Sequence, residues 1–449
     1  DITSGTRNSI VGTFAGDELT TGYYNTILGY SALGEDTQGA TAVALGYAAL
    51  SNQNFTTATV HYNVAVGYNA GTGVTTGINN VIIGGLAGDA LTDADRNVAV
   101  GTSALSADTL GSRSTALGYG TLAAQNFTTA TQVYNTAVGY GAGVSVTTGA
   151  KNTLIGGFSG DALQTGAMNV ALGYNSLGVD TEGTRSVALG NDTLAAQNFT
   201  TATNVYNLAV GHSAANDITT GINNTIIGGV AAQSLTDADY NVAVGTLALT
   251  TDTLGSRSTA VGYEALRNQN FTTATDSYNT ATGYQAGVNI TTGTLNTLSG
   301  GLAGSNITTG VSNVIMGYAT GDALTDADYN VAIGATALTS DTKGGRSVAV
   351  GYATLVMQNF TTATDTYNTA VGYQAGTNVT TGINNTLIGG LSGDALTTGE
   401  FSVAMGYNAL GSETAATRSV AIGASALRDQ NVGGGTTTYN TAVGHIAGF

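Results

Sequence analysis

The chain has 449 residues and a net charge of −17, with 66 Gly and no Pro, Cys or Trp. Charged residues make up only 9% of it and hydrophobic residues 42%, a bias that opposes disorder and favours a folded repeat protein. The lack of cysteine excludes disulfides and thiolate metal sites. The lack of a basic stripe argues against a nucleic-acid partner, and no apolar run approaches the ~20 residues that insert into a membrane.

One short phrase, Asn-(Thr/Val)-Ala-(Val/Leu/Ile)-Gly, recurs along the whole chain, for example at 97–101 and 368–372. Its glycine occurs 25 times between Gly12 and Gly444, at steps of 17 or 21 residues. The phrase alternates β-branched residues with a small one, which predicts a short strand, and the glycine then permits a sharp bend. Helices are disfavoured because Gly, Thr and Val recur in every unit.

A second apolar stretch and a polar turn follow each strand, as at 103–105 and 106–109. Such a unit cannot bury its apolar side alone, so we expect its copies to stack in parallel, each strand beside its copy in the next coil. The predicted fold class is all-β: a parallel β-solenoid, or β-roll, of about 25 coils. We expect a single continuous solenoid over 1–449.

Stacking turns each position of the repeat into a row along the solenoid. Four residues before the glycine, 18 coils have Asn, six have Ser and one has Ala42, which predicts a ladder of buried amides. Four residues after the glycine many coils have Leu, a row that we expect in the core: Leu105, Leu177, Leu249 and Leu338 are examples. Two residues before the glycine most coils have Ala. That row suits either close approach between chains or the interior of a thin roll.

Three steps of 17 residues and one of 21 form a super-repeat of 72 residues. The super-repeats begin near 63, 135, 207, 279, 368 and 440, and one extra 17-residue coil is inserted around 313–317. Identical coils can slip by one coil at little cost. We therefore expect the wider coils and the extra coil to fix the register between neighbouring chains.

The phrases at 368–375 (Asn-Thr-Ala-Val-Gly-Tyr-Gln-Ala) and 380–386 (Thr-Thr-Gly-Ile-Asn-Asn-Thr) resemble repeats of bacteriophage tail fibres and related bacterial surface proteins. The phrases at 346–351 and 418–423 are similar to the Asn-Ser-Val-Ala-Ile-Gly repeats in the heads of trimeric autotransporter adhesins. The resemblance covers the entire chain. It implies a β-roll in a homotrimer, an extracellular location on a virion or cell-surface appendage, and a role in reach or attachment. The steps of 17 and 21 residues are longer than the adhesin repeat, so the coil must be wider or carry larger turns.

The wider coils carry the sequence Gln-Asn-Phe-Thr-Thr-Ala-Thr at 53–59, 125–131, 197–203, 269–275 and 358–364, and a sixth differs at 430–435. One interpretation makes them a row of lateral contact points for a glycan or protein on a host surface. Its candidate surface contacts are Phe55, Phe127, Phe199, Phe271 and Phe360. In the alternative interpretation each Phe folds back over an apolar edge or packs on a neighbouring chain.

Charged residues also recur at fixed spacing. An Arg follows an acidic residue by five positions in the pairs Asp108–Arg113, Asp180–Arg185, Asp252–Arg257, Asp341–Arg346 and Glu413–Arg418, which predicts a turn-closing or interchain ion pair. The turns Thr-Asp-Ala-Asp at 92–95, 236–239 and 325–328 predict solvated turns, because calcium needs six to eight grouped oxygens. His212 and His445 stand where Tyr follows the glycine in other coils, and His61 lies alone in a wide coil.

No Ser/His/Asp grouping recurs, and no glycine-rich loop joins a strand to a helix. We therefore predict no catalytic, cofactor-binding or metal-binding residues and no enzymatic activity. The predicted function is a structural fibre segment of a phage tail fibre or surface adhesin. The alternatives are a receptor- or glycan-binding module that uses the wide coils, and a monomeric surface filament or lattice subunit.

Overall fold

A computed structural model of the chain describes residues 2–415, 417–434 and 436–448. The described residues form strands and turns without a helix, and the chain divides into two compact units, Asp1–Asn223 and Asn224–Phe449. Each unit is a parallel β-solenoid, and the two together hold the 25 coils. The predicted fold class is confirmed. The continuity of one solenoid over 1–449 stays a prediction.

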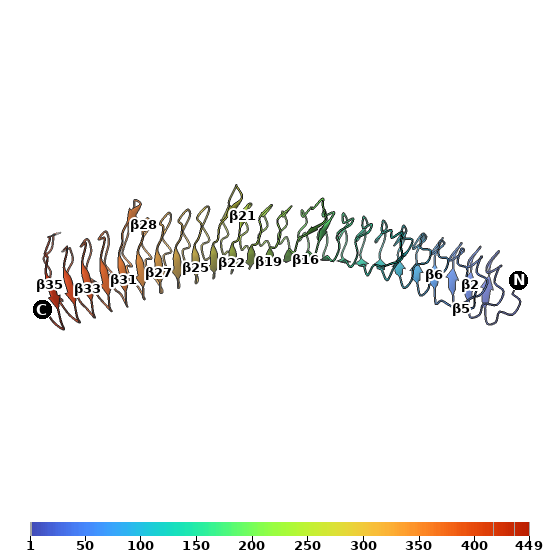
Figure 1. Cartoon of the computed structure of the whole chain (residues 1–449), viewed down its shortest axis with the longest axis horizontal. Coiled ribbons are helices and arrows are strands. Elements are labelled where there is room, and N and C mark those ends of the chain that lie inside the picture. Colours follow the sequence, from blue (N-terminus) through green and yellow to red (C-terminus); the bar gives the residue numbers. More distant parts are fainter. Residues whose placement is uncertain (1, 416, 435, 449) are drawn as a thin grey trace. The chain divides into compact units, whose positions relative to one another are not determined.

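The first unit has one three-residue strand in each coil, and each strand pairs in parallel with the strand of the next coil (Figure 1). These strands are β1 (Ser9–Val11), β2 (Thr26–Leu28), β4 (Val43–Leu45), β6 (Val64–Val66), β7 (Val81–Ile83), β8 (Val98–Val100), β10 (Thr115–Leu117), β12 (Thr136–Val138), β13 (Thr153–Ile155), β14 (Val170–Leu172), β16 (Val187–Leu189) and β18 (Leu208–Val210). Two-residue strands pair at the wide coils: β3 (Gly39–Ala40) with β5 (Thr59–Val60), β9 (Gly111–Ser112) with β11 (Thr131–Gln132), and β15 (Gly183–Thr184) with β17 (Thr203–Asn204).

The second unit repeats this plan, and the coils that carry β21 and β28 project beyond their neighbours (Figure 1). Its three-residue strands are β19 (Thr225–Ile227), β20 (Val242–Val244), β22 (Thr259–Val261), β24 (Thr280–Thr282), β25 (Thr297–Ser299), β26 (Val314–Met316), β27 (Val331–Ile333), β29 (Val348–Val350), β31 (Thr369–Val371), β32 (Thr386–Ile388), β33 (Val403–Met405), β34 (Val420–Ile422) and β35 (Thr441–Val443). Its two-residue pairs are β21 (Gly255–Ser256) with β23 (Thr275–Asp276), and β28 (Gly344–Gly345) with β30 (Thr364–Asp365).

Equivalent residues of successive coils lie directly above one another. In β7 and β8 the three partners are Val81 with Val98, Ile82 with Ala99, and Ile83 with Val100. The centre of each strand points inward, so Ala99 is fully buried while its two neighbours are partly exposed. The Ala row therefore lines the interior of one chain. Of the two interpretations of that row, close approach between chains is wrong, because no surface of this Ala side chain remains for a partner.

Small turn residues make room in the interior for the large strand centres. Four residues after the repeat glycine the coil of Ile82 has Gly88, where a Cβ would press against Ile82 and Leu91. The coil before it has Gly71, where a Cβ would also press against Ile82. Where the strand centre is Ala99, the turn position is Leu105, which is fully buried, so the predicted core row of Leu is confirmed. Close packing explains why glycine stands on both sides of Ile82.

The extra coil of the second unit copies the large-centre type of coil. Leu298 and Ile315 occupy the strand centres of β25 and β26, two coils in succession. Both strands keep full parallel register with each other and with β24 and β27. The insertion is therefore one more coil, added without a bulge or a change of pairing.

The buried amide ladder is also confirmed. Asn97 is fully buried, its Nδ2 donates to the carbonyl oxygen of Gly111 at 2.9 Å, and its Oδ1 accepts from the backbone N of Ser114 at 2.8 Å. Its own backbone N donates to Oδ1 of Asn80 at 2.9 Å. Every polar group of the side chain is thus used by the next coil, which is how a buried amide avoids a desolvation penalty.

The repeat glycine is fixed by the close approach of neighbouring coils. Gly101 has a φ of +133°, a conformation that residues with a side chain rarely adopt. A Cβ at this position would also collide with the carbonyl oxygen of Gly118 in the next coil. The positive φ recurs at all 25 repeat glycines, and the collision recurs where a following coil lies against the glycine, as at Gly84 and Gly118.

Candidate functional site

The five phenylalanines predicted as surface contacts are buried. Their exposed fractions lie between 6% and 8% for Phe55, Phe127, Phe199, Phe271 and Phe360. The three residues that follow each of these phenylalanines are exposed, such as 128–130. The prediction of exposed aromatic anchors is therefore wrong for the single chain. The rings fold back over their own coils, as the alternative interpretation stated.

Each buried Phe covers a buried carboxylate. Asp108 lies seven residues after the repeat glycine and is fully buried. Its Oδ1 accepts hydrogen bonds from the backbone N of Gly111 at 3.1 Å and of Phe127 at 3.0 Å. Its Oδ2 accepts a hydrogen bond from Nε2 of Gln125 at 2.5 Å. Equivalent carboxylates with the same three donors belong to Asp36, Asp180, Asp252 and Asp341.

The glutamine joins this carboxylate to the asparagine ladder. Nε2 of Gln125 also donates to Oγ of Ser114 at 3.0 Å, and its Oε1 accepts from Nδ2 of Asn135 at 2.9 Å. Asn135 itself donates to the carbonyl oxygen of Gly149 at 2.8 Å. We call each such set of Asp, Gln and Asn with its neighbours a carboxylate node. The node occurs once in each super-repeat, at the wide coil.

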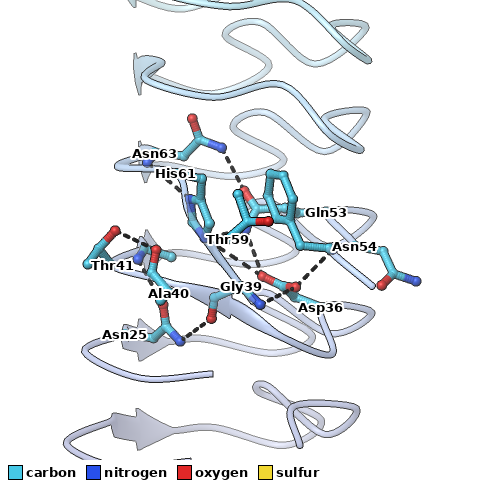
Figure 2. A network of polar contacts seen from close by, with 12 residues as sticks. Asn25, Asp36, Gly39, Ala40, Thr41, Gln53, Asn54, Thr59, His61 and Asn63 are labelled. Carbon is cyan, nitrogen blue, oxygen red and sulfur yellow. Dashed lines mark hydrogen bonds and ion pairs between the residues drawn. The ribbon is translucent and has the colours of Figure 1, made fainter. Parts of the chain in front are cut away.

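Figure 2 shows the first node, in which the serine is missing. Ala42 stands at the serine position, and the ring of His61 lies beside Gln53 instead. Nε2 of His61 is 3.0 Å from Nε2 of Gln53, a contact whose donor depends on the tautomer, and 3.8 Å from Oδ2 of Asp36. The imidazole stacks on Phe55 at a centroid distance of 4.9 Å. The histidine that was predicted to lie alone is thus part of a node.

The sixth node uses a glutamate. Glu413 accepts hydrogen bonds from Nε2 of Gln430 at 3.1 Å and from the backbone N of Ala415 at 3.1 Å. The longer glutamate side chain reaches Gln430, which stands at the glutamine position of the other nodes. In the wide coil that contains Gln430, the sequence 430–435 replaces the Phe-containing sequence. Residues 416 and 435 of this region lie outside the described residues.

Burial dominates the electrostatics of the nodes. It raises the pKa of Asp36, Asp108, Asp180 and Asp252 above the ordinary value of 3.8, and the hydrogen bonds from Gln and backbone N–H groups act in the opposite direction. Burial lowers the pKa of His61 from 6.5 to about 4, so this imidazole is neutral at pH 7. The recorded donors to Asp108 are N–H groups, which suit a carboxylate and offer no oxygen ligand to a cation.

The predicted ion pairs between each Asp and the Arg five residues later are wrong. The acidic partners are buried in the nodes, while the arginines lie on the surface against tyrosines. Arg113 donates to the hydroxyl of Tyr134 at 2.7 Å, and its guanidinium lies 5.5 Å from that ring centroid. Arg257 pairs with Asp276 of the next coil at 2.9 Å. The partner of this arginine lies in the next coil, so a spacing of five residues within one coil does not predict it.

The acidic turns cap neighbouring coils. Oδ1 of Asp95 accepts from the backbone N of Ile78 at 2.8 Å, and Oδ1 of Asp328 accepts from the backbone N of Val311 at 2.7 Å. In the part of the chain that the structure describes, no group of three or more His, Cys, Asp or Glu side chains could hold a metal ion. Within the same residues, no helix is long and apolar enough to cross a membrane.

A second candidate is the outer face of the three-residue strands. The first and third residues of every such strand point outward, and all of them are Val, Leu, Ile, Met, Thr or Ser. Leu117 is 44% exposed and Leu172 is 48% exposed. We call this surface of each unit the strand face. It carries no charge, although the chain as a whole carries −17.

Two rows of tyrosine flank the strand face in every super-repeat. One row follows the repeat glycine directly, and the other stands five residues before it. These rows contain 21 of the 22 tyrosines, with exposed fractions of 44% to 70%. Tyrosines in successive coils stack: the rings of Tyr119 and Tyr140 are 5.3 Å apart at 9°, and those of Tyr352 and Tyr373 are 5.6 Å apart at 14°.

Comparison with known proteins identifies no relative. No protein-family model matches the chain, and no curated protein matches it. The function proposed below therefore depends on the geometry of the chain itself.

The carboxylate node and the strand face differ in how well the sequence predicts them. The node has a signal that was missed. Seven residues after the glycine, two successive coils of each super-repeat have an acidic residue and then Gln, such as Asp108 and Gln125, whereas the coils before them have apolar residues, such as Val74 and Leu91. A polar pair in an otherwise apolar row indicates a buried pair. The strand face follows from the alternation of inward and outward side chains in the repeated phrase, once the central Ala is known to lie in the interior of the solenoid.

Proposed function

We propose that the chain is a non-catalytic structural fibre segment that associates side by side with copies of itself through the strand face. The expected stoichiometry is three. The observation that carries the proposal is the uncharged strand face of each unit, made of Val, Leu, Ile, Met, Thr and Ser side chains, on a strongly acidic chain. Copies with a net charge of −17 repel each other, so close approach is favoured where no charge is present.

The size of the strand face is sufficient for a stable interface. Twelve strands of the first unit, at a spacing of ~4.8 Å and with three residues at ~3.3 Å each, cover roughly 600 Å². The two tyrosine rows extend this area. A standard interface buries about 800 Å² on each partner, and tyrosine is enriched in such interfaces. An exposed apolar surface of this size also indicates an interaction site in general.

The proposed location is extracellular, on a virion or cell-surface appendage. The sequence resemblance to tail fibres and adhesin heads supports this location, and a regular solenoid suits a part that provides reach. The nodes hold the wide coils together from within, and their aspartates are fully buried. Their role in the proposal is structural.

The test is the mass of the full chain in solution. Light scattering is expected to give three times the chain mass of 44.6 kDa. Leu117→Glu with Leu172→Glu puts two charges on the strand face of the first unit and is expected to dissociate the assembly. Both side chains are exposed in the single chain, so the fold should persist, as circular dichroism can check.

The matched control adds the same charges elsewhere. Thr129→Glu with Thr201→Glu changes two exposed residues at the tips of wide coils and is expected to leave the mass unchanged. A wild-type mass equal to one chain would contradict self-association and favour the monomeric filament. Equal dissociation by both pairs of substitutions would show that net charge, and not the strand face, controls assembly.

A lateral receptor- or glycan-binding role loses its main support. The rings proposed as anchors are buried, and what projects from those wide coils is a short segment of Thr and Ala such as 128–130. A glycan array on the wild type and on Phe127→Ala tests the role directly. Loss of binding with a retained fold would restore it.

A further inference from the structure

Four of the node carboxylates are fully buried without a charged partner among their recorded contacts. Asp108 and Asp180 belong to the first unit, and Asp252 and Asp341 belong to the second. Their recorded partners are a Gln side chain and the backbone N of a Gly and a Phe. The arginine five residues later in sequence lies outside, against tyrosine.

An ionised carboxylate in such a place has lost its hydration. Neutral hydrogen-bond donors restore part of this loss, whereas an ion pair or a metal ion would restore more. The neutral acid loses much less on burial. The folded state therefore favours the protonated form more strongly than the unfolded chain does, in which the same carboxyl is solvated.

We propose that Asp108, Asp180 and Asp252 are proton-binding sites through which acidification stabilises the solenoid of each unit. The proposal goes beyond the proposed function, because it requires no association between chains. It reverses the usual behaviour of buried acidic groups in ion pairs, whose loss of charge unfolds proteins at low pH.

The direction follows from proton linkage. Burial raises the folded-state pKa of these groups above 3.8. The stabilisation is fully present below the unfolded value near 3.8 and is lost as the pH rises through the raised folded value. Within that window each site takes up one proton on folding, so the folding equilibrium constant changes by about tenfold per pH unit and per site.

A titratable neighbour sets the first node apart from the node of Asp108. Around Asp108 the recorded neighbours are Gly111, Gln125, Phe127 and, through the glutamine, Ser114, none of which titrates near neutral pH. In the first node His61 lies 3.8 Å from Asp36, and its lowered pKa acts in the opposite direction. That node is therefore not among the three sites.

The test compares two variants that each remove one negative charge from the first unit. Asp108→Asn removes the titratable carboxyl group of the node, and Asp93→Asn removes an exposed carboxylate that accepts from Oγ1 of Thr76. Urea unfolding of the full chain is followed from about pH 7 to about pH 4.5. The wild type and Asp93→Asn are expected to gain stability on acidification with the same slope. Asp108→Asn should lose the share of one site in that slope, a factor of about ten in the folding equilibrium constant per pH unit. The slope is compared and not the stability at pH 7, because the Asn amide nitrogen would face the donor Nε2 of Gln125.

Two results would overturn the proposal. One is an Asp108→Asn variant with the same slope as the wild type, because Asp108 would then take up no proton on folding. The other comes from the wild type itself, so that it does not depend on the folding of a variant. Infrared spectra of the folded wild type should contain a band of buried protonated carboxyl groups while the pH is still above the ordinary value of 3.8, and its absence there would show that the nodes remain ionised.

Discussion

Two nodes of the first unit solve the same problem with different residues. In the node of Asp108, the second hydrogen of Gln125 is accepted by Ser114, and Val133 fills the space beside it. In the node of Asp36, the serine position is Ala42, and His61 occupies the position equivalent to Val133 (Figure 2). The node of Asp108 thus combines a small polar residue with a large apolar one, and the node of Asp36 combines a small apolar residue with a large polar one. The comparison teaches that the node preserves its hydrogen bonds and its volume, and not the identity of its residues.

The largest expected effect comes from removing the glutamine, a residue that is present in both nodes. Gln125→Leu leaves Oδ2 of Asp108 without its donor and Nδ2 of Asn135 with one acceptor fewer. We expect a loss of about 3 kcal/mol in unfolding free energy, because a buried charged group loses a hydrogen bond. Urea unfolding measures it. The control Gln132→Leu, on an exposed side chain, should stay within about 0.5 kcal/mol; similar losses from both would contradict the importance of the node.

The two nodes should also differ in their response to acid. His61 is buried and neutral, with a pKa lowered from 6.5 to about 4, so the folded state binds its proton more weakly than the unfolded chain does. Its contribution to stability is present above pH 6.5 and is lost as the pH falls towards 4, by up to ~3 kcal/mol. The double variant Ala42→Ser with His61→Val should lose this acid sensitivity. The same pH dependence in the wild type and the double variant would show that His61 titrates normally.

A transplant of one node into the other tests the exchange directly. His61→Val alone leaves Gln53 without the nitrogen that lies 3.0 Å from its Nε2, and we expect a loss of about 2 kcal/mol at pH 7. Adding Ala42→Ser reproduces the arrangement of Ser114 and Val133 and should restore most of that loss. Thermal unfolding of the three proteins measures both steps. A double variant no more stable than the single one would mean that the two nodes are not interchangeable.

The smallest effect is expected where a node carries one hydroxyl more than it needs. In the node of Asp252, Ser277 stands at the position of Val133 and contacts Oγ of Ser258 at 2.5 Å, while Ser258 also accepts from Gln269 at 2.7 Å. Ser277→Val should change the unfolding free energy by less than about 1 kcal/mol, since Ser258 keeps its other partner. A larger loss in urea unfolding would show that the second hydroxyl is an essential part of that node.

The sequence predicts the features that recur in every coil. The strand, the Leu row represented by Leu105 and the amide ladder represented by Asn97 all follow from one period, because stacking converts a repeated residue into a row with one environment. Each of these predictions is confirmed. The period does not predict which side of the strand faces inward. The Ala row was therefore compatible with a contact between chains or with the interior of the roll, and the structure places it in the interior.

The nodes were missed because Asp108 was paired with Arg113, five residues away in the same coil. Its partners Gln125 and Phe127 lie 17 and 19 residues along the chain, in the next coil. Contacts in a solenoid run between coils, so the informative separation is the length of a coil. The sequence left two interpretations of Phe127 open, an exposed contact or a ring that folds back over its coil, and the burial of the ring supports the second.

The asparagine ladder also gives each unit a direction. Both functional atoms of an Asn side chain reach towards the coil that follows it: Nδ2 of Asn80 donates to the carbonyl oxygen of Ala94, and its Oδ1 accepts from the backbone N of Asn97. Ribosomes extend a protein from its N-terminus, so an emerging coil meets a predecessor whose amide already offers a donor and an acceptor. The two ends of a unit therefore differ: each coil presents side-chain amides to the coil that follows it and backbone groups to the coil that precedes it.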